Sequence, residues 1–266
     1  MRVKGILSYD GSSFHGYAIN SDVRTVAGEL DSALTKVLGE RVLVTCAGRT
    51  DRGVHAQGQV ISFDTPKGTD LSKLQNSINR ICRPHIVINN LSAAPPEFDA
   101  RFSATGRCYR YRILNQKNPN PFLAATTWHV PTNLNLEKMV QASNYFLGTH
   151  DFSSFCKRTS PQPGYKERSL VRTVQSVTWS KKDENVIEFE IFASSFCHQM
   201  VRSIVGTIVR VGKGHISEKK IPEILTARDR QGAGSPAPPH GLILWSVQYP
   251  DFKDDLERVA ETESAP

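Results

Sequence analysis

Hydrophobic residues recur with two different periods along the first half of the chain, and each period predicts one kind of element. Apolar residues spaced three and four apart predict helices over 26–38 and 71–81. Gly39 is a natural stop for the first of these helices, and Arg83-Pro84 ends the second. Short runs rich in β-branched residues predict strands at 3–8, 42–46, 59–63 and 86–88.

The second half repeats this pattern. Helical spacing covers 136–147 and 196–211, and a loop rich in proline and glycine covers 229–240. Alternating or continuous apolar runs predict strands at 108–114, 171–179, 186–192 and 242–247. Strands and helices in two similar halves predict an α+β fold with two sheet-plus-helix subdomains. We expect subdomains at 1–105 and 106–250, followed by a tail at 251–266, with the seam near Phe102–Gly106.

Composition limits the class of protein. The chain has 266 residues, of which 39% are hydrophobic and 22% charged, as in soluble globular proteins. No apolar run approaches the ~18–20 residues of a membrane span, and the first ten residues do not fit a signal peptide. The five cysteines are odd in number and form no C-x-x-C, which argues against a disulfide framework and a zinc ribbon. We therefore expect a reducing, cytoplasmic setting with no membrane association, and the histidines show no metal-ligand spacing.

Charge is unevenly distributed. The net charge is +7, but residues 251–266 hold six acidic and two basic groups, so residues 1–250 carry +11. A basic body with an acidic tail favours a polyanionic partner such as a nucleic acid, although many basic enzymes bind none.

The segment 47–56, Ala-Gly-Arg-Thr-Asp-Arg-Gly-Val-His-Ala, concentrates groups that could carry chemistry. It follows a predicted strand, so Asp51 should lie in a turn at the end of a sheet. Arg49 and Arg52 flank Asp51 and favour its charged form, which suits a nucleophile or a base. The alternative is a turn aspartate that only accepts hydrogen bonds from its own backbone.

Two further segments combine cations with aromatic rings or loops. Between Arg101 and Arg112, cations alternate with rings; on a strand Tyr109 would share one face with Tyr111, and Arg110 the other with Arg112. Such a strand can bind RNA through phosphates and stacked bases, or it can bury its tyrosines and leave its arginines in solvent. A second basic segment, 157–172, is either solvated or follows a phosphate backbone.

The predicted helix 196–211 places His198, Arg202 and Gly206 on one face, because they recur every four residues. Gly206 would let another backbone or a ligand approach that face. The alternative for Arg202 is a structural salt bridge.

Taken together and in this order, these segments resemble the tRNA pseudouridine synthase A family over residues 3 to about 250. The matching motifs are Tyr9-Asp10-Gly11, residues 47–56, Arg101-Phe102-Ser103-Ala104-Thr105, Tyr109-Arg110-Tyr111, Phe152-Ser153-Ser154-Phe155, Arg172-Thr173-Val174, His198-Gln199-Met200-Val201-Arg202 with Gly206, and Gly241-Leu242. One departure is Gly16-Tyr17-Ala18, where the family usually has Gly-Trp-Gln. If that loop touches RNA, the range of substrates could differ.

The resemblance implies a cofactor-free homodimer that isomerises uridine to pseudouridine at positions 38–40 in the anticodon stem-loop of tRNA. It implies two ferredoxin-like subdomains in each chain. Asp51 would be the catalytic aspartate, Tyr109 the tyrosine that packs on the target base, and Arg202 the arginine that pairs with Asp51. Arg49 would assist base flipping and Leu242 would line the uracil pocket. Arg101 and Arg110 are further candidates for RNA binding.

Two rival functions share the basic surface. An RNA-binding relative without activity would not need Asp51, Tyr109 and Arg202 together. A hydrolase using Asp51 as its base would need a second acid or a metal site, and the sequence suggests neither. Whether Asp51 attacks C1′, attacks C6 or promotes a glycal route is left open by the sequence.

Overall fold

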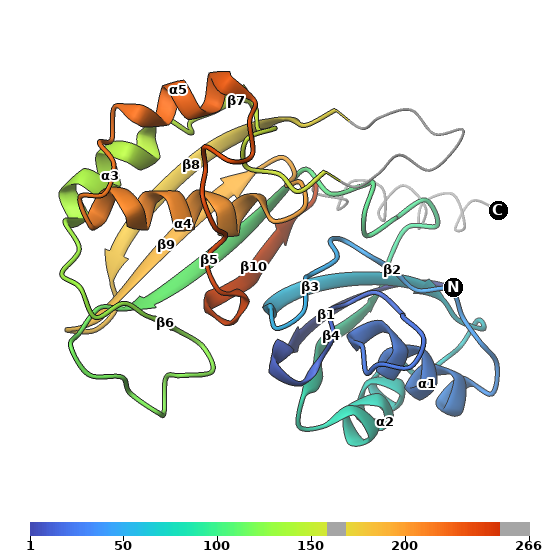
Figure 1. Ribbon diagram of the computed structural model, residues 1–266. Helices are drawn as coiled ribbons and strands as arrows, with labels where there is room; N and C mark the ends of the chain where they lie inside the picture. Colours follow the sequence, from blue (N-terminus) through green and yellow to red (C-terminus); the bar gives the residue numbers. More distant parts are fainter. Residues whose placement is uncertain (159–168, 251–266) are drawn as a thin grey trace. The chain divides into compact units, whose positions relative to one another are not determined.

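The computed structural model describes residues 1–158 and 169–250, and the chain forms two compact units (Figure 1). Among the described residues, unit 1 comprises 1–105 together with 244–250, and unit 2 comprises Gly106–Ile243. The chain therefore leaves unit 1 after Thr105, at the expected seam, but it returns there at Leu244. The expected subdomain 106–250 differs from unit 2 at this end, because most of the last strand belongs to unit 1. The tail at 251–266 lies outside the described residues.

Unit 1 follows the order of elements found in ferredoxin-like domains. Its elements are β1 (Arg2–Tyr9), α1 (Val26–Leu38), β2 (Thr45–Cys46), β3 (His55–Asp64), α2 (Leu71–Cys82) and β4 (Ile86–Ala93), with a short 3₁₀ turn at Gly11–Ser13. The strands pair antiparallel in the order β4-β1-β3-β2. The helices α1 and α2 contact each other and cover one face of this sheet (Figure 1).

Local sequence signals set the ends of both helices in unit 1. The Thr25 hydroxyl accepts a hydrogen bond from the amide of Gly28 at the start of α1, and Gly39 ends the helix at φ +78°. Asp70 accepts from the amide of Lys73 at the start of α2. The predicted stop before Pro84 is confirmed, because α2 ends at Cys82 and Arg83 is extended.

Unit 2 repeats the strand–helix pattern with additions. Its elements are β5 (Gly106–Leu114), β6 (Trp128–His129), α3 (Leu136–Asn144), β7 (Gly148–Asp151), β8 (Val171–Lys181), β9 (Val186–Ala193), α4 (Met200–Gly212), α5 (Lys220–Ala227) and a 3₁₀ turn at Pro239–Gly241. Antiparallel pairing gives the order β5-β9-β8-β7, with β6 parallel to β5. The helices α3 and α4 pack together on this sheet (Figure 1). The strand β10 (Leu242–Gln248) begins in unit 2 and continues into unit 1.

Three predicted elements are shorter than their sequence pattern. Only Thr45 and Cys46 of the expected strand 42–46 pair with β3, and the first part of that run, where Leu43 is 91% exposed, forms no strand. The helix predicted to 147 ends at Asn144, because the chain tightens into a turn in which the amide of Phe146 donates to Ser143 O. The helix predicted from 196 begins at Met200, because Gln199 adopts φ +64°.

One helix escaped the sequence analysis, and two strands exceed their predicted lengths. The helix α5 has only eight residues and carries Pro222 in its first turn, which weakens the periodic signal. The strands β3 and β4 extend well beyond the predicted 59–63 and 86–88. Among the helices of the described chain, none is long and apolar enough to cross a membrane.

A buried carboxylate organises the charges on one face of unit 2. Glu188 of β9 is only 2% exposed and lies 2.8 Å from Arg112 Nε, 3.3 Å from Lys182 Nζ and 3.6 Å from Arg110 Nε. Arg110 also lies 2.6 Å from the carboxylate of Glu190, which is 34% exposed. The acids of β9 therefore neutralise Arg110 and Arg112 of β5. The sequence alone predicts these arginines either in solvent or in contact with RNA.

We predict that Glu188→Gln lowers the free energy of unfolding by about 1–3 kcal/mol, because three cations lose their buried counter-charge. This is below the value for a fully buried pair, since the cations remain partly hydrated. Glu190→Gln is the matched control and should cost about 1 kcal/mol or less. Urea titration of both variants measures the difference, and equal losses would contradict the buried role of Glu188.

Candidate active site

The loop that carries Asp51 is held at its base by one side-chain amide. Gln59 of β3 is fully buried; its Nε2 donates to Gly48 O at 2.6 Å and its Oε1 accepts from Gly48 N at 3.3 Å. One side chain therefore satisfies both backbone groups of Gly48, three residues before Asp51. Next to it, the amide of Ala47 donates to Val60 O and extends the pairing of β2 with β3.

The residue before Asp51 anchors the loop from the other side. The hydroxyl of Thr50 lies 2.8 Å from the hydroxyl of Tyr9, and Thr50 O accepts from the amide of Tyr17 at 3.0 Å. A turn then follows in which Val54 N donates to Asp51 O, with Gly53 at φ +76°. The side chain of Asp51 is left half-buried at the tip, between the exposed side chains of Arg49 and Arg52.

The Tyr9-Asp10-Gly11 motif supports the same loop. The amide of Gly11 donates to His55 Nδ1 at 3.1 Å, just after the loop returns to β3. A Cβ on Gly11 would collide with the backbone of Val54, so only glycine allows this approach. Two motifs that are 40 residues apart in sequence are thus parts of one packed structure.

The departure from the family pattern at Gly16-Tyr17-Ala18 is a packing feature of this loop. Tyr17 is buried and its ring lies 6.3 Å from that of Tyr9. Gly16 adopts φ +99°, and a Cβ there would lie 3.0 Å from Thr50 O. Burial raises the pKa of the Tyr17 hydroxyl well above its ordinary value, so this side chain stays neutral. The side chain of Tyr17 therefore buttresses the Asp51 loop from inside unit 1.

The tyrosines of β5 point toward the interior of unit 2. Tyr109 is 9% exposed and meets the ring of Phe196 edge-on, with 5.0 Å between centroids. Tyr111 is fully buried and its hydroxyl donates to Pro238 O at 2.8 Å. Burial raises the pKa of Tyr111 far above its ordinary value, and the charge of Arg202 opposes this shift. Arg202 is therefore electrostatically close to the tyrosine face of β5.

Arg202 is fixed in the first turn of α4 by reciprocal bonds to a loop. Its Nε donates to Ala237 O at 2.8 Å, and Ala237 N donates to Arg202 O at 2.9 Å. One turn later, a Cβ on Gly206 would collide with Ser235 O, so the close backbone approach expected at Gly206 is present. The same loop leads into Leu242, which is buried at the start of β10.

The predicted site residues divide between the two units. Unit 1 holds Asp51 with Arg49 and Arg101, and unit 2 holds Tyr109, Arg110, Arg202 and Leu242. The helix face expected for His198 is wrong, because α4 begins only at Met200 and His198 precedes it. Arg202 and Gly206 do share that helix.

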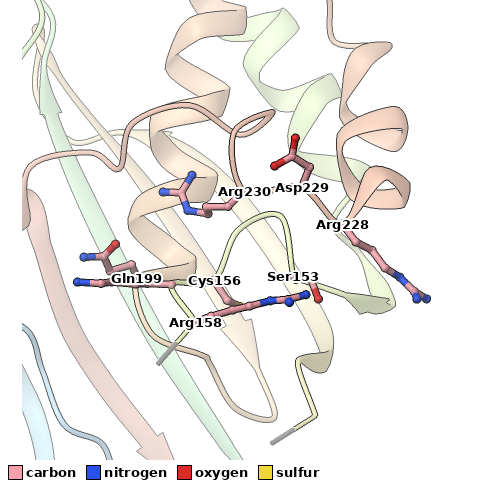
Figure 2. Close-up of a pocket in the computed structure, with 8 residues that line it drawn as sticks. Ser153, Cys156, Arg158, Gln199, Arg228, Asp229 and Arg230 are labelled. Carbon is pink, nitrogen blue, oxygen red and sulfur yellow. The ribbon is translucent and has the colours of Figure 1, made fainter. Parts of the chain in front are cut away.

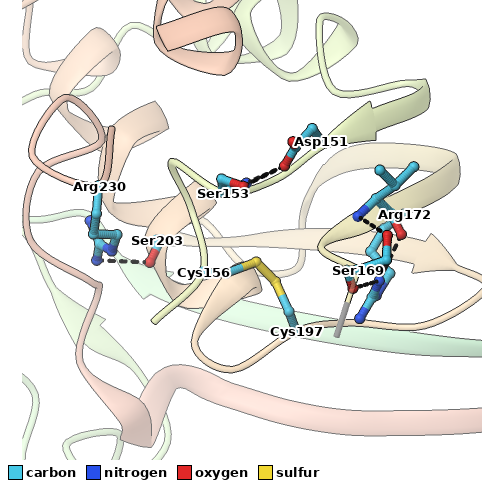
Figure 3. The surroundings of a disulfide bond; sticks show 9 residues. Asp151, Ser153, Cys156, Ser169, Arg172, Cys197, Ser203 and Arg230 are labelled. Carbon is cyan, nitrogen blue, oxygen red and sulfur yellow. Dashed lines mark hydrogen bonds between the residues drawn. A yellow bond between two sulfur atoms is a disulfide. The ribbon is translucent and has the colours of Figure 1, made fainter. Parts of the chain in front are cut away.

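Two cysteines that no sequence pattern pairs form a disulfide in unit 2 (Figure 3). Cys156 and Cys197 are bonded, with 5.7 Å between their Cα atoms. Lys157 N also donates to His198 O at 2.9 Å, so the segment after β7 lies against the approach to α4. The expectation of unpaired cysteines is therefore wrong for this pair, whose separation of 41 residues carries no local signal.

Several residues of the site were missed from the sequence. Gln59 gave no pattern signal, because its role depends on pairing across the sheet, and nothing in the motif 47–56 indicated the bonds of Thr50 to Tyr9 and Tyr17. Phe102 is 81% exposed beside Arg101, whose guanidinium lies 5.4 Å from its ring, and an Asx turn at Asp99 presents both. Within 1–158 and 169–250, no group of three or more His, Cys, Asp or Glu side chains could hold a metal ion.

Comparison with known proteins gives one family. The family model described as tRNA pseudouridine synthase matches residues 6–103 and 142–250. A tRNA pseudouridine synthase A of Bacillus licheniformis is 39% identical over 251 residues, covering 94% of this chain and 99% of that protein. The same enzyme of Acetivibrio thermocellus is 40% identical over 247 residues, covering 93% and 99%.

Solved structures give weaker likenesses. An H/ACA ribonucleoprotein bound to a substrate RNA aligns over 78% of this chain and 43% of that chain, at 12% identity and TM-score 0.35. An archaeal box H/ACA Nop10–Cbf5 complex aligns over 78% and 42%, at 11% identity and TM-score 0.34.

We predict that Gln59→Met lowers the free energy of unfolding by about 1–3 kcal/mol, because both backbone groups of Gly48 lose a partner whose side chain is fully buried. Gln75→Met is a matched control: the Gln75 amide also bonds backbone groups, on β4, but its side chain is only half-buried and its bond to Asn89 O is exposed, so water can replace it more easily. Chemical denaturation of both variants tests this. A smaller loss for Gln59→Met than for the control would refute the role of Gln59 as the support of the loop.

Proposed function

The chain belongs to the tRNA pseudouridine synthase family, and on that premise we propose that it isomerises uridine to pseudouridine at positions 38–40 in the anticodon stem-loop of tRNA. The observation that carries this proposal is the Asp51 loop, which lies inside the first matched range and is braced by Tyr9 of β1, Tyr17 of the segment before α1, and Gln59 of β3. A turn aspartate with only a local structural role would not need supports from three separate elements.

The reaction sets the requirements for the site. The N1–C1′ bond of uridine breaks, the uracil turns, and a C5–C1′ bond forms. The proton on C5 is lost and N1 gains one, so atoms and oxidation state balance within the nucleotide. An isomerisation of this kind needs a carboxylate and a positioned general base that accepts the C5 proton, and it consumes no cofactor.

Asp51 is proposed as that carboxylate and Arg202 as its partner. Each is fixed within its own unit, Asp51 by the backbone turn to Val54 and Arg202 by the bonds to Ala237. Pairing with a guanidinium would keep the carboxylate charged after water is displaced, and each group would offset the desolvation of the other. Attack at C1′, attack at C6 and a glycal route all use this carboxylate.

The remaining residues are proposed to hold the extruded base. Phe196 packs edge-on against Tyr109, which fixes the direction of the Tyr109 ring for packing on uracil. Leu242, buried at the start of β10, would line the uracil pocket. Arg49 is exposed beside Asp51, where it would fill the space that the extruded uridine leaves in the anticodon stem.

RNA binding is proposed to rest on exposed cations more than on the strand β5. Arg101 is exposed beside the exposed ring of Phe102, an arrangement suited to phosphate contact and base stacking. Arg110 contributes least, because its guanidinium already neutralises Glu190. By analogy with the family, we also propose a cytoplasmic homodimer that works without a metal or nucleotide cofactor.

Asp51→Asn should lower the rate of pseudouridine formation by several orders of magnitude, because it keeps the size of the side chain and removes its charge. Affinity for tRNA should change little, since cations bind the phosphates. The assay pairs tRNA isomerisation with filter binding, and Asp183→Asn, in the exposed turn between β8 and β9, is the control. Near-normal turnover by Asp51→Asn would show that the catalytic assignment is wrong. If the wild type binds tRNA but forms no pseudouridine, the alternative of an RNA-binding relative without activity is favoured.

A further inference from the structure

Unit 2 contains a cavity of about 360 Å³ that the proposed reaction does not use (Figure 2). It lies between the segment after β7, the start of α4 and the segment after α5. Its lining residues are Ser153, Cys156, Lys157, Arg158, Gln199, Arg228, Asp229 and Arg230. Half of these side chains are cations, brought together from two segments that are 70 residues apart.

The positive charge of this pocket is only partly neutralised. Arg228 pairs with Asp151 at 3.1 Å, and Asp229 is the one acid in the lining. No carboxylate of the described residues forms an ion pair with Lys157, Arg158 or Arg230. The pocket therefore has excess positive charge, and its complementary ligand is an anion.

Arg230 is a built part of the pocket. It is half-buried, and its guanidinium donates to Gly234 O at 2.7 Å and to the hydroxyl of Ser203 at 3.0 Å. Both acceptors are neutral, so these bonds fix the direction of the guanidinium without cancelling its charge. Burial lowers the pKa of Arg230 somewhat, as expected for a cation held away from water without a counter-ion.

Backbone strain is concentrated at the same place. Among the described residues, three that are not glycine have positive φ, and two of them, Gln199 at φ +64° and Arg228 at φ +52°, line this pocket. Such conformations persist where the surroundings impose them, and they gather at binding sites. Gln199 also leaves the 13-residue helix α4 without a side-chain cap or an acid in its first turn. The positive end of the helix dipole is therefore not offset by a capping side chain or by an acid in the first turn of the helix.

We propose that this pocket binds a backbone phosphate of the tRNA substrate. The inference rests on the proposed function, and it assigns Lys157, Arg158 and Arg230 as the phosphate ligands. Gln199 lines the pocket and immediately precedes α4, and Arg202 lies in the first turn of that helix. A phosphate bound here would therefore contact the start of the helix that holds the proposed partner of Asp51. The disulfide between Cys156 and Cys197 links the segment that carries Lys157 and Arg158 to the segment that carries Gln199 (Figure 3).

The test compares Lys157→Gln/Arg158→Gln with the wild type in tRNA binding between 0.05 and 0.3 M salt. Both side chains are exposed, so the variant should fold, which a thermal melt checks. Each lost phosphate contact should flatten the slope of log K against log salt by about 0.9 and weaken binding at 0.1 M salt about 8-fold, or about 60-fold for two contacts. Lys67→Gln, on an exposed turn of unit 1, is the control and should leave slope and affinity unchanged.

A second arm uses Arg230→Gln and inorganic phosphate. The same flattening in this variant supports a phosphate site that serves binding. An unchanged slope in both variants overturns the proposal. If millimolar inorganic phosphate raises the melting temperature of the wild type and the tRNA slope is unchanged in the variants, the pocket is a site for free anions instead. All of these are binding measurements, so they remain decisive even if the wild type makes no pseudouridine.

Discussion

The buried amide of Gln59 is the interaction on which the proposed catalytic centre depends. It satisfies both backbone groups of Gly48 where a short edge strand ends, and it therefore fixes the base of the loop that carries Asp51. Without it, two backbone polar groups would lie beside a hydrophobic core with no partner, which is costly. A carboxylate can act on a single atom of a bound nucleotide only if its position is set before the substrate arrives. The bonds of Thr50 to Tyr9 and Tyr17 complete this fixation.

In unit 2, too, hydrogen bonds fix the proposed site residues before the substrate arrives, but a loop makes these bonds in place of a strand. The reciprocal bonds between Arg202 and Ala237, and the bond from Tyr111 to Pro238, hold the loop between α5 and β10 against α4 and β5. Gly206 makes this possible, because a larger residue would collide with Ser235 O. One segment, the loop between α5 and β10, thus positions Arg202, the tyrosines of β5 and the start of β10. Each unit presents a rigid part of the proposed chemistry, and the chain crosses between them at Thr105 and again at Ile243.

Much of this could be predicted from the sequence, and the exceptions have physical causes. The helix at Val26–Leu38 was predicted residue for residue, because the apolar spacing and Gly39 agree, and the structure adds the cap at Thr25. The start of α4 was not, because the positive φ of Gln199 interrupts a continuous apolar pattern. The motif around Asp51 was visible because its residues are contiguous. Its support by Gln59 and Gly16, the disulfide and the basic pocket were not visible, because they form only when distant segments pack.

The measurement that tests the proposed function most directly is a map of pseudouridine in unmodified tRNA transcripts incubated with the purified protein. We expect new pseudouridine only within the anticodon stem-loop, at one or more of positions 38–40, without added metal or nucleotide. The absence of pseudouridine from every transcript tested, or its appearance only outside the anticodon stem-loop, would contradict the function proposed for this chain.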